Sequence, residues 1–177
     1  GGMFTYNTMQ TFISVLGMQP LHMVAPPSDD PRRLTEFPEQ LIDCLVAMTE
    51  AGIAPRDIVT PASLRNALTV VMAMSDSTHV TLHRVEIARA AGIDLWGEVL
   101  SQDEFNAMSR RLPVLVNMRP FGLYSMVDVD ERGGLQVIVK EMLDAGLLDG
   151  ATVTCTGETL REQVGRLDPP RPDEDVV

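Results

Sequence analysis

Three stretches of this chain carry apolar side chains at the spacing of an amphipathic helix, and such stripes have to be buried against neighbouring elements. Gly52 and Gly146 follow the first and the last of them, at places where a glycine commonly ends a helix. Thr60 precedes Pro61 at the start of the second, which is the order of an N-cap and a first helical residue. We therefore expect packed helical layers. The stripes occupy residues 34–48, 64–74 and 135–143.

Shorter signals complete the expected helices. Residues 9–16 and 77–91 predict two further helices, and Ser101 with Glu104 has the spacing of a capping box that begins another. Pro38 interrupts the first stripe, so that helix either kinks at this proline or begins there.

Two short apolar segments, residues 114–116 and 152–156, are the expected strands. The fold class is therefore α/β: a helix-rich layered domain with a small parallel sheet that belongs to a larger domain. We expect residues 1–167 to form this one domain. Residues 168–177 are rich in proline and acidic side chains and are expected to be a linker or a disordered tail.

Composition excludes several classes of function. With 14 Lys and Arg against 25 Asp and Glu, the net charge of −11 argues against a nucleic-acid partner, which needs clustered cations. Lys140 is the only lysine and no Gly-Lys-Ser/Thr string occurs, so a P-loop is excluded. The longest apolar run, residues 67–74, is too short to span a membrane. Cys44 and Cys155 lie in apolar contexts that suit reduced thiols, so a cytoplasmic protein is expected.

Short strings spread over nearly the whole chain have to be considered together. They read GGMFTYNTM at residues 1–9, LGM at 16–18, PRDIVT at 55–60, MAMSDSTH at 72–79, SRRLP at 109–113 and TCTGETL at 154–160. In this order they resemble the dihydroxy-acid dehydratase and sugar-acid dehydratase family. The first loop is closer to the branched-chain dihydroxy-acid type than to the sugar-acid type.

The resemblance implies a hydro-lyase that removes water from a 2,3-dihydroxy carboxylic acid to give a 2-keto acid. In this family a [2Fe-2S] cluster binds the leaving 3-hydroxyl, Mg²⁺ binds the carboxylate and the 2-hydroxyl, and a base removes the C2 proton. The family also implies a homo-oligomer. Its partners would be a small hydroxy acid and the remainder of the same polypeptide, with no nucleic acid and no membrane.

The family's cofactor ligands are expected outside this chain. Its cluster cysteines lie upstream, the last of them directly before Gly1, and its Mg²⁺ ligands, carbamylated lysine and serine base also lie elsewhere. The chain is thus interpreted as the middle and C-terminal part of a dehydratase N-terminal domain. We expect this fragment alone to bind no cofactor and to be inactive, and reconstitution with iron and sulfide to give no cluster absorbance.

Five polar residues are the candidates for the neighbourhood of substrate or cluster. The resemblance implies this position for Thr5, Asn7 and Thr8 in the first loop and for Ser77 and Thr78 in the fourth string. The alternative for the first three is that they only brace a polar turn. No catalytic residue and no metal ligand are expected within the chain itself.

The chain departs from the family pattern at three places. Tyr6 replaces a small alanine, Ser75-Asp76 replaces a Gly-Gly pair, and His79 replaces an asparagine. Glycine pairs serve where the backbone approaches another group closely or needs a positive φ, so the loss of this pair puts the family's usual substrate and activity in doubt. Two rival functions therefore stay open: a sugar-acid (aldonate) dehydratase, and a non-catalytic binding or assembly domain that kept the fold.

Overall fold

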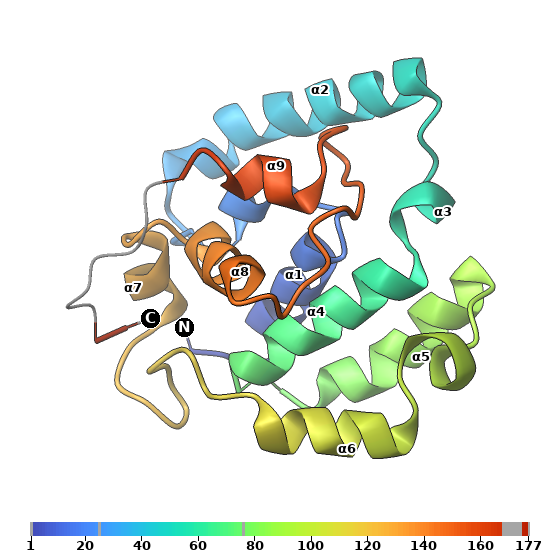
Figure 1. The fold of residues 1–177 in the computed structure, drawn as a ribbon. Coiled ribbons are helices and arrows are strands. Elements are labelled where there is room, and N and C mark those ends of the chain that lie inside the picture. The colour runs from blue at the N-terminus through green and yellow to red at the C-terminus, as the bar shows by residue number, and fades with distance from the viewer. Residues whose placement is uncertain (1, 25, 76, 168–174, 177) are drawn as a thin grey trace.

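The computed structural model describes residues 2–24, 26–75, 77–167, 175 and 176, and its regular structure is helical (Figure 1). None of the helices within these ranges is long and apolar enough to cross a membrane. Single turns of 3-10 helix occur at Leu21–Met23 and Pro31–Arg33, and a π-helical turn occurs at Leu95–Val99. The α-helices are α1 (Thr5–Val15), α2 (Glu36–Ala51), α3 (Pro55–Ile58), α4 (Pro61–Ala73), α5 (His79–Ala91), α6 (Gln102–Arg111), α7 (Met126–Asp130), α8 (Leu135–Asp144) and α9 (Leu160–Val164).

Helix α4 is the centre of the packing. It contacts α1, α5, α6 and the π-helical turn, and nine of its 13 residues are buried. Its start is the expected one, because Thr60 Oγ1 accepts from Ser63 N at 3.2 Å while Ser63 Oγ accepts from Thr60 N at 2.9 Å. The apolar run therefore serves as a core helix between layers.

Helix α2 runs along the outer edge of the molecule (Figure 1). It starts at Glu36 with Pro38 in its first turn, so the second of the two alternatives for this proline is correct. Gly52 ends it in the left-handed conformation, as expected. Its apolar stripe, however, stays open: Phe37 is buried, but the large apolar side chains beyond it are 44–64% exposed. These side chains are Leu41, Ile42, Leu45 and Val46.

The expected small sheet has no counterpart among the described residues. Residues 114–116 and 152–156 are extended or turn segments that do not pair with each other, so their interpretation as strands was wrong. Leu115 N instead donates to Ala73 O at the end of α4, and Cys155 N donates to Gly17 O just after α1. Val153 also forms an isolated antiparallel bridge with Thr159, but this pairing spans a tight turn and is too short to make a strand. The helix-rich part of the expected fold is confirmed.

The remaining helical signals hold. Ser101 and Glu104 form the expected capping box at the start of α6. The stripe of α8 is fully buried and Gly146 follows this helix at φ +71°. The expected tail lies largely outside the described residues, since residues 168–174 and 177 are not described.

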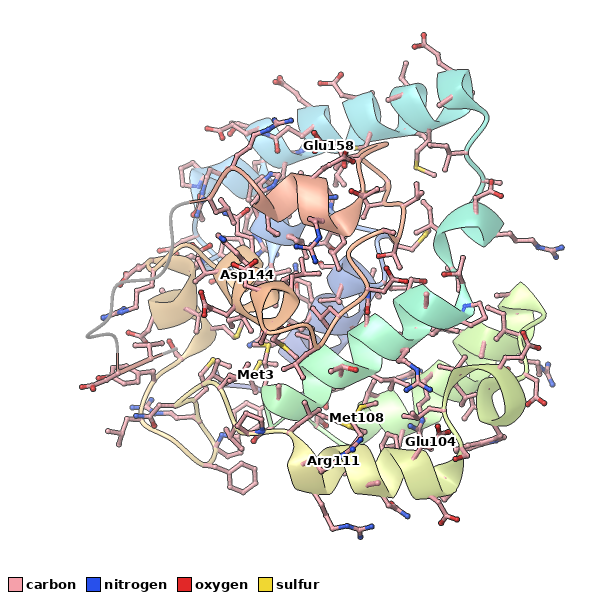
Figure 2. The ribbon with its side chains drawn as sticks, in the orientation of Figure 1. Met3, Glu104, Met108, Arg111, Asp144 and Glu158 are labelled. Atoms are coloured by element: carbon pink, nitrogen blue, oxygen red, sulfur yellow. The ribbon has the colours of Figure 1, made fainter. Side chains whose placement is uncertain are left out.

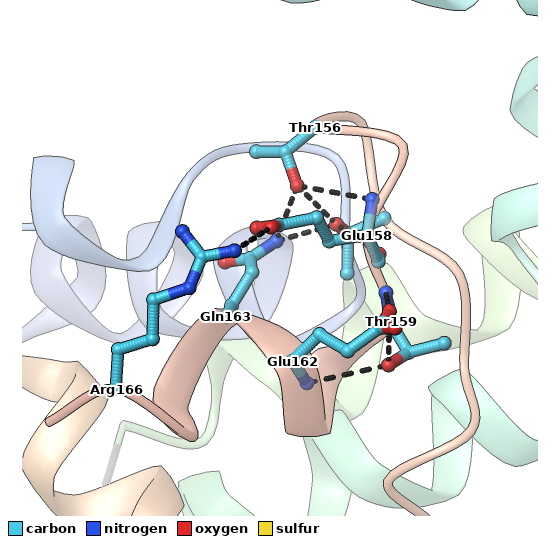
Figure 3. A network of polar contacts seen from close by, with 7 residues as sticks. Thr156, Glu158, Thr159, Glu162, Gln163 and Arg166 are labelled. Carbon is cyan, nitrogen blue, oxygen red and sulfur yellow. Dashed lines mark hydrogen bonds and ion pairs between the residues drawn. The ribbon is translucent and has the colours of Figure 1, made fainter.

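The segment that leads into α9 is held by a network of side-chain hydrogen bonds (Figure 3). Thr159 and Glu162 form a capping box, with the Glu162 carboxylate accepting from Thr159 N at 2.8 Å. Gln163 donates to two threonine hydroxyls in the preceding turn. An ion pair of 2.8 Å joins Glu158 to Arg166. The family string at residues 154–160 therefore has a structural role, because its side chains hydrogen-bond to one another and to α9.

Candidate functional site

Three loops meet at one end of the helical layers, and we call them the three-loop rim. They are residues 2–4 together with the first turn of α1, residues 77–79 at the start of α5, and the turn of residues 117–124 that follows α6. The expectation that Thr5, Asn7 and Thr8 lie in a loop was wrong, because α1 begins at Thr5. Met3 N donates to Arg119 O at 2.7 Å, which ties the first loop to the third. The Met3 side chain, labelled in Figure 2, is buried in the core.

Gly2 shows why this rim needs a glycine. A Cβ atom at this position would lie 2.4 Å from Arg119 O, well inside van der Waals contact. Asn7 Nδ2 donates to Gly2 O at 2.7 Å and holds the loop against the first turn of α1. The close approach of two backbones explains the glycine, and the amide of Asn7 serves as a brace.

Two threonines join the first loop to the second. Thr8 is fully buried and its Oγ1 accepts a hydrogen bond from Ser77 N at 3.0 Å. One turn earlier, Thr5 Oγ1 and His79 Nδ1 form a hydrogen bond of 3.3 Å at the exposed surface. The structure thus bonds Thr8 directly to Ser77, places Thr5 beside His79, and holds Asn7 against Gly2.

The Thr78 side chain makes no hydrogen bond to the described residues. Thr78 precedes α5, its side chain is exposed and makes no capping bond, and its carbonyl accepts from Thr81 N at 3.0 Å. Asn7 and Thr8 therefore brace the rim. The side chains of Thr5 and Thr78 are exposed, and the Thr5 hydroxyl is bonded to His79.

Ser75 occupies the first position of the replaced glycine pair, and its backbone conformation shows why a glycine suits this position. Its φ is +55°, and it is the one non-glycine residue with positive φ in the described ranges. An L-residue in this left-handed region is strained by about 1–2 kcal/mol, which a glycine avoids. The first glycine of the family's Gly-Gly pair thus marks a position that needs a positive φ. This chain has a serine there, whose backbone is strained. Asp76 lies outside the described residues.

The other departures lie on the surface of the rim. Tyr6 is 62% exposed, next to Phe4 at 56%. His79 stacks on His83 with ring centroids 5.7 Å apart, and Glu86 pairs with Arg89. Within the described ranges, no group of three or more histidine, cysteine, aspartate or glutamate side chains is arranged to hold a metal ion. The rim is therefore an aromatic and hydroxyl surface.

A cavity of about 400 Å³ adjoins the rim, lined by Ser75, residues 114–118, Phe121 and Asp175 among others. Its wall is the 117–124 turn, which sequence reasoning missed. A Cβ atom at Gly122 would lie 2.3 Å from the Asn117 carbonyl carbon, so this turn also requires a glycine. The Pro-x-Gly order of residues 120–122 is the signal that could have found it.

The two cysteines lie away from the rim. Cys155 is bonded through its backbone to Gly17, at the opposite end of α1 from Thr5, and Cys44 lies on α2. Burial raises the pKa of Cys155 to about 12, and burial also raises the pKa of Cys44. Two cysteines do not make a cluster ligand set. The described residues therefore do not fit an iron–sulfur cluster of their own.

Comparison with known proteins extends the sequence resemblance. Residues 1–163 match the family described as dihydroxy-acid/6-phosphogluconate dehydratase N-terminal. The dihydroxy-acid dehydratases of Leifsonia xyli subsp. xyli and of a Nocardioides species are 42% and 41% identical to the chain over all 177 residues. That of Acidothermus cellulolyticus is 42% identical over 176 residues. The chain spans 30% of the length of each of these relatives.

Proposed function

The chain belongs to the dihydroxy-acid/6-phosphogluconate dehydratase family through the N-terminal part of that fold, and from this premise we propose its function. We propose that it is part of a hydro-lyase that converts a 2,3-dihydroxy carboxylic acid into a 2-keto acid. The observation that carries the proposal is the three-loop rim, where residues 69 and 74 positions apart in sequence are bonded to one another. Sites on loops held by a rigid scaffold are the usual place for such chemistry.

We assign separate roles to the rim residues. Asn7 and Thr8 position the first loop, because their side chains are used in bonds to Gly2 O and Ser77 N. The hydroxyl groups of Thr5, Ser77 and Thr78 would face the hydroxy acid and donate to or accept from its oxygens. The Tyr6 ring would limit the space beside it. None of these groups is a strong acid or base at neutral pH, so they orient the substrate and do not carry the proton.

The cofactors belong to the proposal for the longer protein. A [2Fe-2S] cluster and Mg²⁺, when bound, supply the Lewis acidity that a poor hydroxide leaving group and a weakly acidic C2 proton require. This chain's described residues hold no ligand set for either group. We therefore assign the ligands to other parts of a longer polypeptide, with this chain contributing the loops around them.

The exposed apolar stripe of α2 supports the proposal that another part of the protein packs against this helix. Exposed apolar patches commonly mark interaction surfaces, and the relatives are about three times as long as this chain. We propose that the remainder of the same polypeptide covers this stripe in a cytoplasmic homo-oligomer.

Two alternatives have their own support. The matching family also includes 6-phosphogluconate dehydratases, so a sugar-acid substrate is the second candidate. The strained Ser75 and the substituted His79 favour the third, a domain that kept the fold for binding or assembly.

The test uses the native-length protein, assayed with 2,3-dihydroxy-3-methylbutanoate and with gluconate. Thr8→Val removes the acceptor of Ser77 N at nearly constant volume, and we expect kcat/KM to fall about ten- to a hundredfold because the rim shifts. Thr49→Val on α2 also removes a hydroxyl bonded to the backbone, but far from the rim, and should leave kcat/KM unchanged.

The outcomes separate the three candidates. Turnover of the branched dihydroxy acid that depends on Thr8 supports the proposal. Turnover of gluconate alone selects the sugar-acid enzyme. Absence of both activities in the cofactor-loaded protein, or equal activity of the Thr8 and Thr49 variants, overturns it.

A further inference from the structure

A groove between α4 and α6 lies away from the three-loop rim. It contains a cavity of about 430 Å³, lined by Arg65 on α4, by Met108 and Arg111 on α6, and by Leu112 and Leu147. We call these five residues the arginine groove. A second cavity of about 280 Å³ shares Arg65, Met108 and Arg111 and continues the groove along α6. Met108 and Arg111 are labelled in Figure 2 on the turn of α6 that follows Glu104.

The positive charge of the groove is poorly neutralised within the protein. Arg65 has one ion pair, to Glu104 at 3.8 Å, and both side chains are about half exposed, so this contact is weak. Arg111 has no ion pair or hydrogen bond to the described residues through its guanidinium, and the same holds for Arg110 beside it. A local excess of cations stands out in a chain with 25 acidic and 14 basic residues.

Helix electrostatics accounts for only part of this arrangement. Arg110 and Arg111 lie in the last turn of α6, where cations stabilise the helix dipole. Arg65 lies near the N-terminal end of α4, where the dipole does not favour a cation. Its place opposite Arg111 is therefore not explained by the stability of its own helix.

Glu104 is the one carboxylate beside the groove in the described residues, and it is occupied elsewhere. It accepts from Ser101 N at 2.9 Å and from Ser101 Oγ at 2.8 Å in the capping box of α6. These bonds lower the pKa of Glu104, so it stays charged and directed at the helix start. It lines the smaller cavity but not the larger one.

The rest of the larger cavity is apolar or already satisfied. Met108 is 9% exposed and its flexible thioether can adapt to a ligand. Leu112, Pro113 and Leu147 continue the apolar wall, and Thr69 Oγ1 already donates to Arg65 O at 2.8 Å. A ligand for this groove needs one anionic end and an apolar body.

From this arrangement we propose that the arginine groove is a binding site for a small aliphatic carboxylate. Arg65 and Arg111 would clamp the carboxylate, for which the planar guanidinium offers paired donors. The aliphatic body would lie on Met108, Leu112 and Leu147. The cavity volume falls in the range of small-molecule sites. This site is separate from the three-loop rim, which lies at the other end of α4 and would act on a hydroxylated acid.

The test is a titration of the 177-residue chain with hexanoate, followed through the ¹³C-labelled methyl groups of its methionines. We expect the Met108 signal to shift and saturate, while Met142 in the core and the partly exposed Met48 on α2 stay in place. Hexanol and hexylammonium, which lack the carboxylate, should not saturate Met108.

Variants make the assignment specific. Arg65→Gln and Arg111→Gln should each weaken hexanoate binding about three- to tenfold, as expected for a partly exposed charge pair. Arg56→Gln, an exposed arginine on α3, is the matched control and should leave the affinity unchanged. Glu104→Gln removes the nearby negative charge and should tighten binding about twofold. An equal response to hexanol, a shift confined to Met48, or an affinity that both groove variants leave unchanged would overturn the proposal.

Discussion

In helix α4, nine of 13 residues are buried, whereas in helix α2 Phe37 is the one buried residue of 16. Both helices have an apolar stripe at helical spacing, a start signal and a residue with positive φ shortly after the end. Helix α4 contacts three other helices, while α2 chiefly contacts the 3-10 turn at Pro31–Arg33. The periodicity of a stripe thus predicts a helix and its apolar face, but not which element covers that face.

The difference has a physical consequence for stability. Apolar area removed from water contributes about 25 cal/mol per Å², so α4 contributes to folding through its stripe and α2 largely does not. Helix α2 is formed by its own backbone bonds and by the burial of Phe37 at its start. It is the element of this chain most dependent on a partner.

The largest expected effect comes from equal truncations in the two helices. Leu68→Ala removes a side chain that is 1% exposed, and we expect the free energy of unfolding to fall by about 2–5 kcal/mol. Leu45→Ala removes one that is 64% exposed and should change it by no more than about 0.5 kcal/mol. Urea unfolding of both variants measures this contrast, and equal losses would contradict it.

Substitutions at the starts of the two helices should give a smaller difference in the free energy of unfolding. Thr60→Ala removes the hydroxyl that accepts from Ser63 N and should cost about 1 kcal/mol. Thr35→Ala at the start of α2 removes a hydroxyl that donates to Pro31 O and caps no helical N–H. It should cost less, and the same urea curves test the order; a larger loss at Thr35 would refute it.

The helix ends give the smallest effect. Helix α2 ends at Gly52 with φ +69°, and α4 is followed by Ser75 with φ +55°. Ser75→Gly should stabilise the protein by about 0.5–1 kcal/mol because it relieves the left-handed strain. Ser109→Gly, at an exposed position in the last turn of α6, should instead destabilise it by a similar amount. A loss at Ser75 comparable to that at Ser109 would show that the backbone there is not strained.

Local features of the fold were predictable from the sequence. The Thr60 cap, the Ser101–Glu104 capping box and the buried stripe of α8 each depend on residues within a few positions of one another. The expected sheet failed because a strand is specified by a distant partner: residues 114–116 meet the end of α4, and residues 152–156 pair only with the adjacent residues 158–160 and with Gly17. The openness of α2 was not predictable for the same reason.

The resemblance named candidate site residues, whose role stays a prediction, but it could not give their contacts. The resemblance pointed to Thr5, Thr8 and Ser77, and the replaced glycine pair indicated a backbone requirement that the φ of Ser75 confirms. The turn of residues 117–124 and its bond to Met3 were missed, because no local pattern relates positions more than 100 residues apart. The arginine groove was missed likewise, since Arg65 and Arg111 come together only through packing of two helices.

Native-state hydrogen exchange of the backbone amides in α2 and α4 tests the central comparison most directly, in one sample and without mutation. The account predicts that amides in the middle of α4 exchange only through global unfolding, with the free energy found from urea. Amides in the middle of α2 should exchange through a local opening of clearly lower free energy. Equal protection of the two helices would contradict the account, because it would mean that α2 is as firmly packed in this chain as α4.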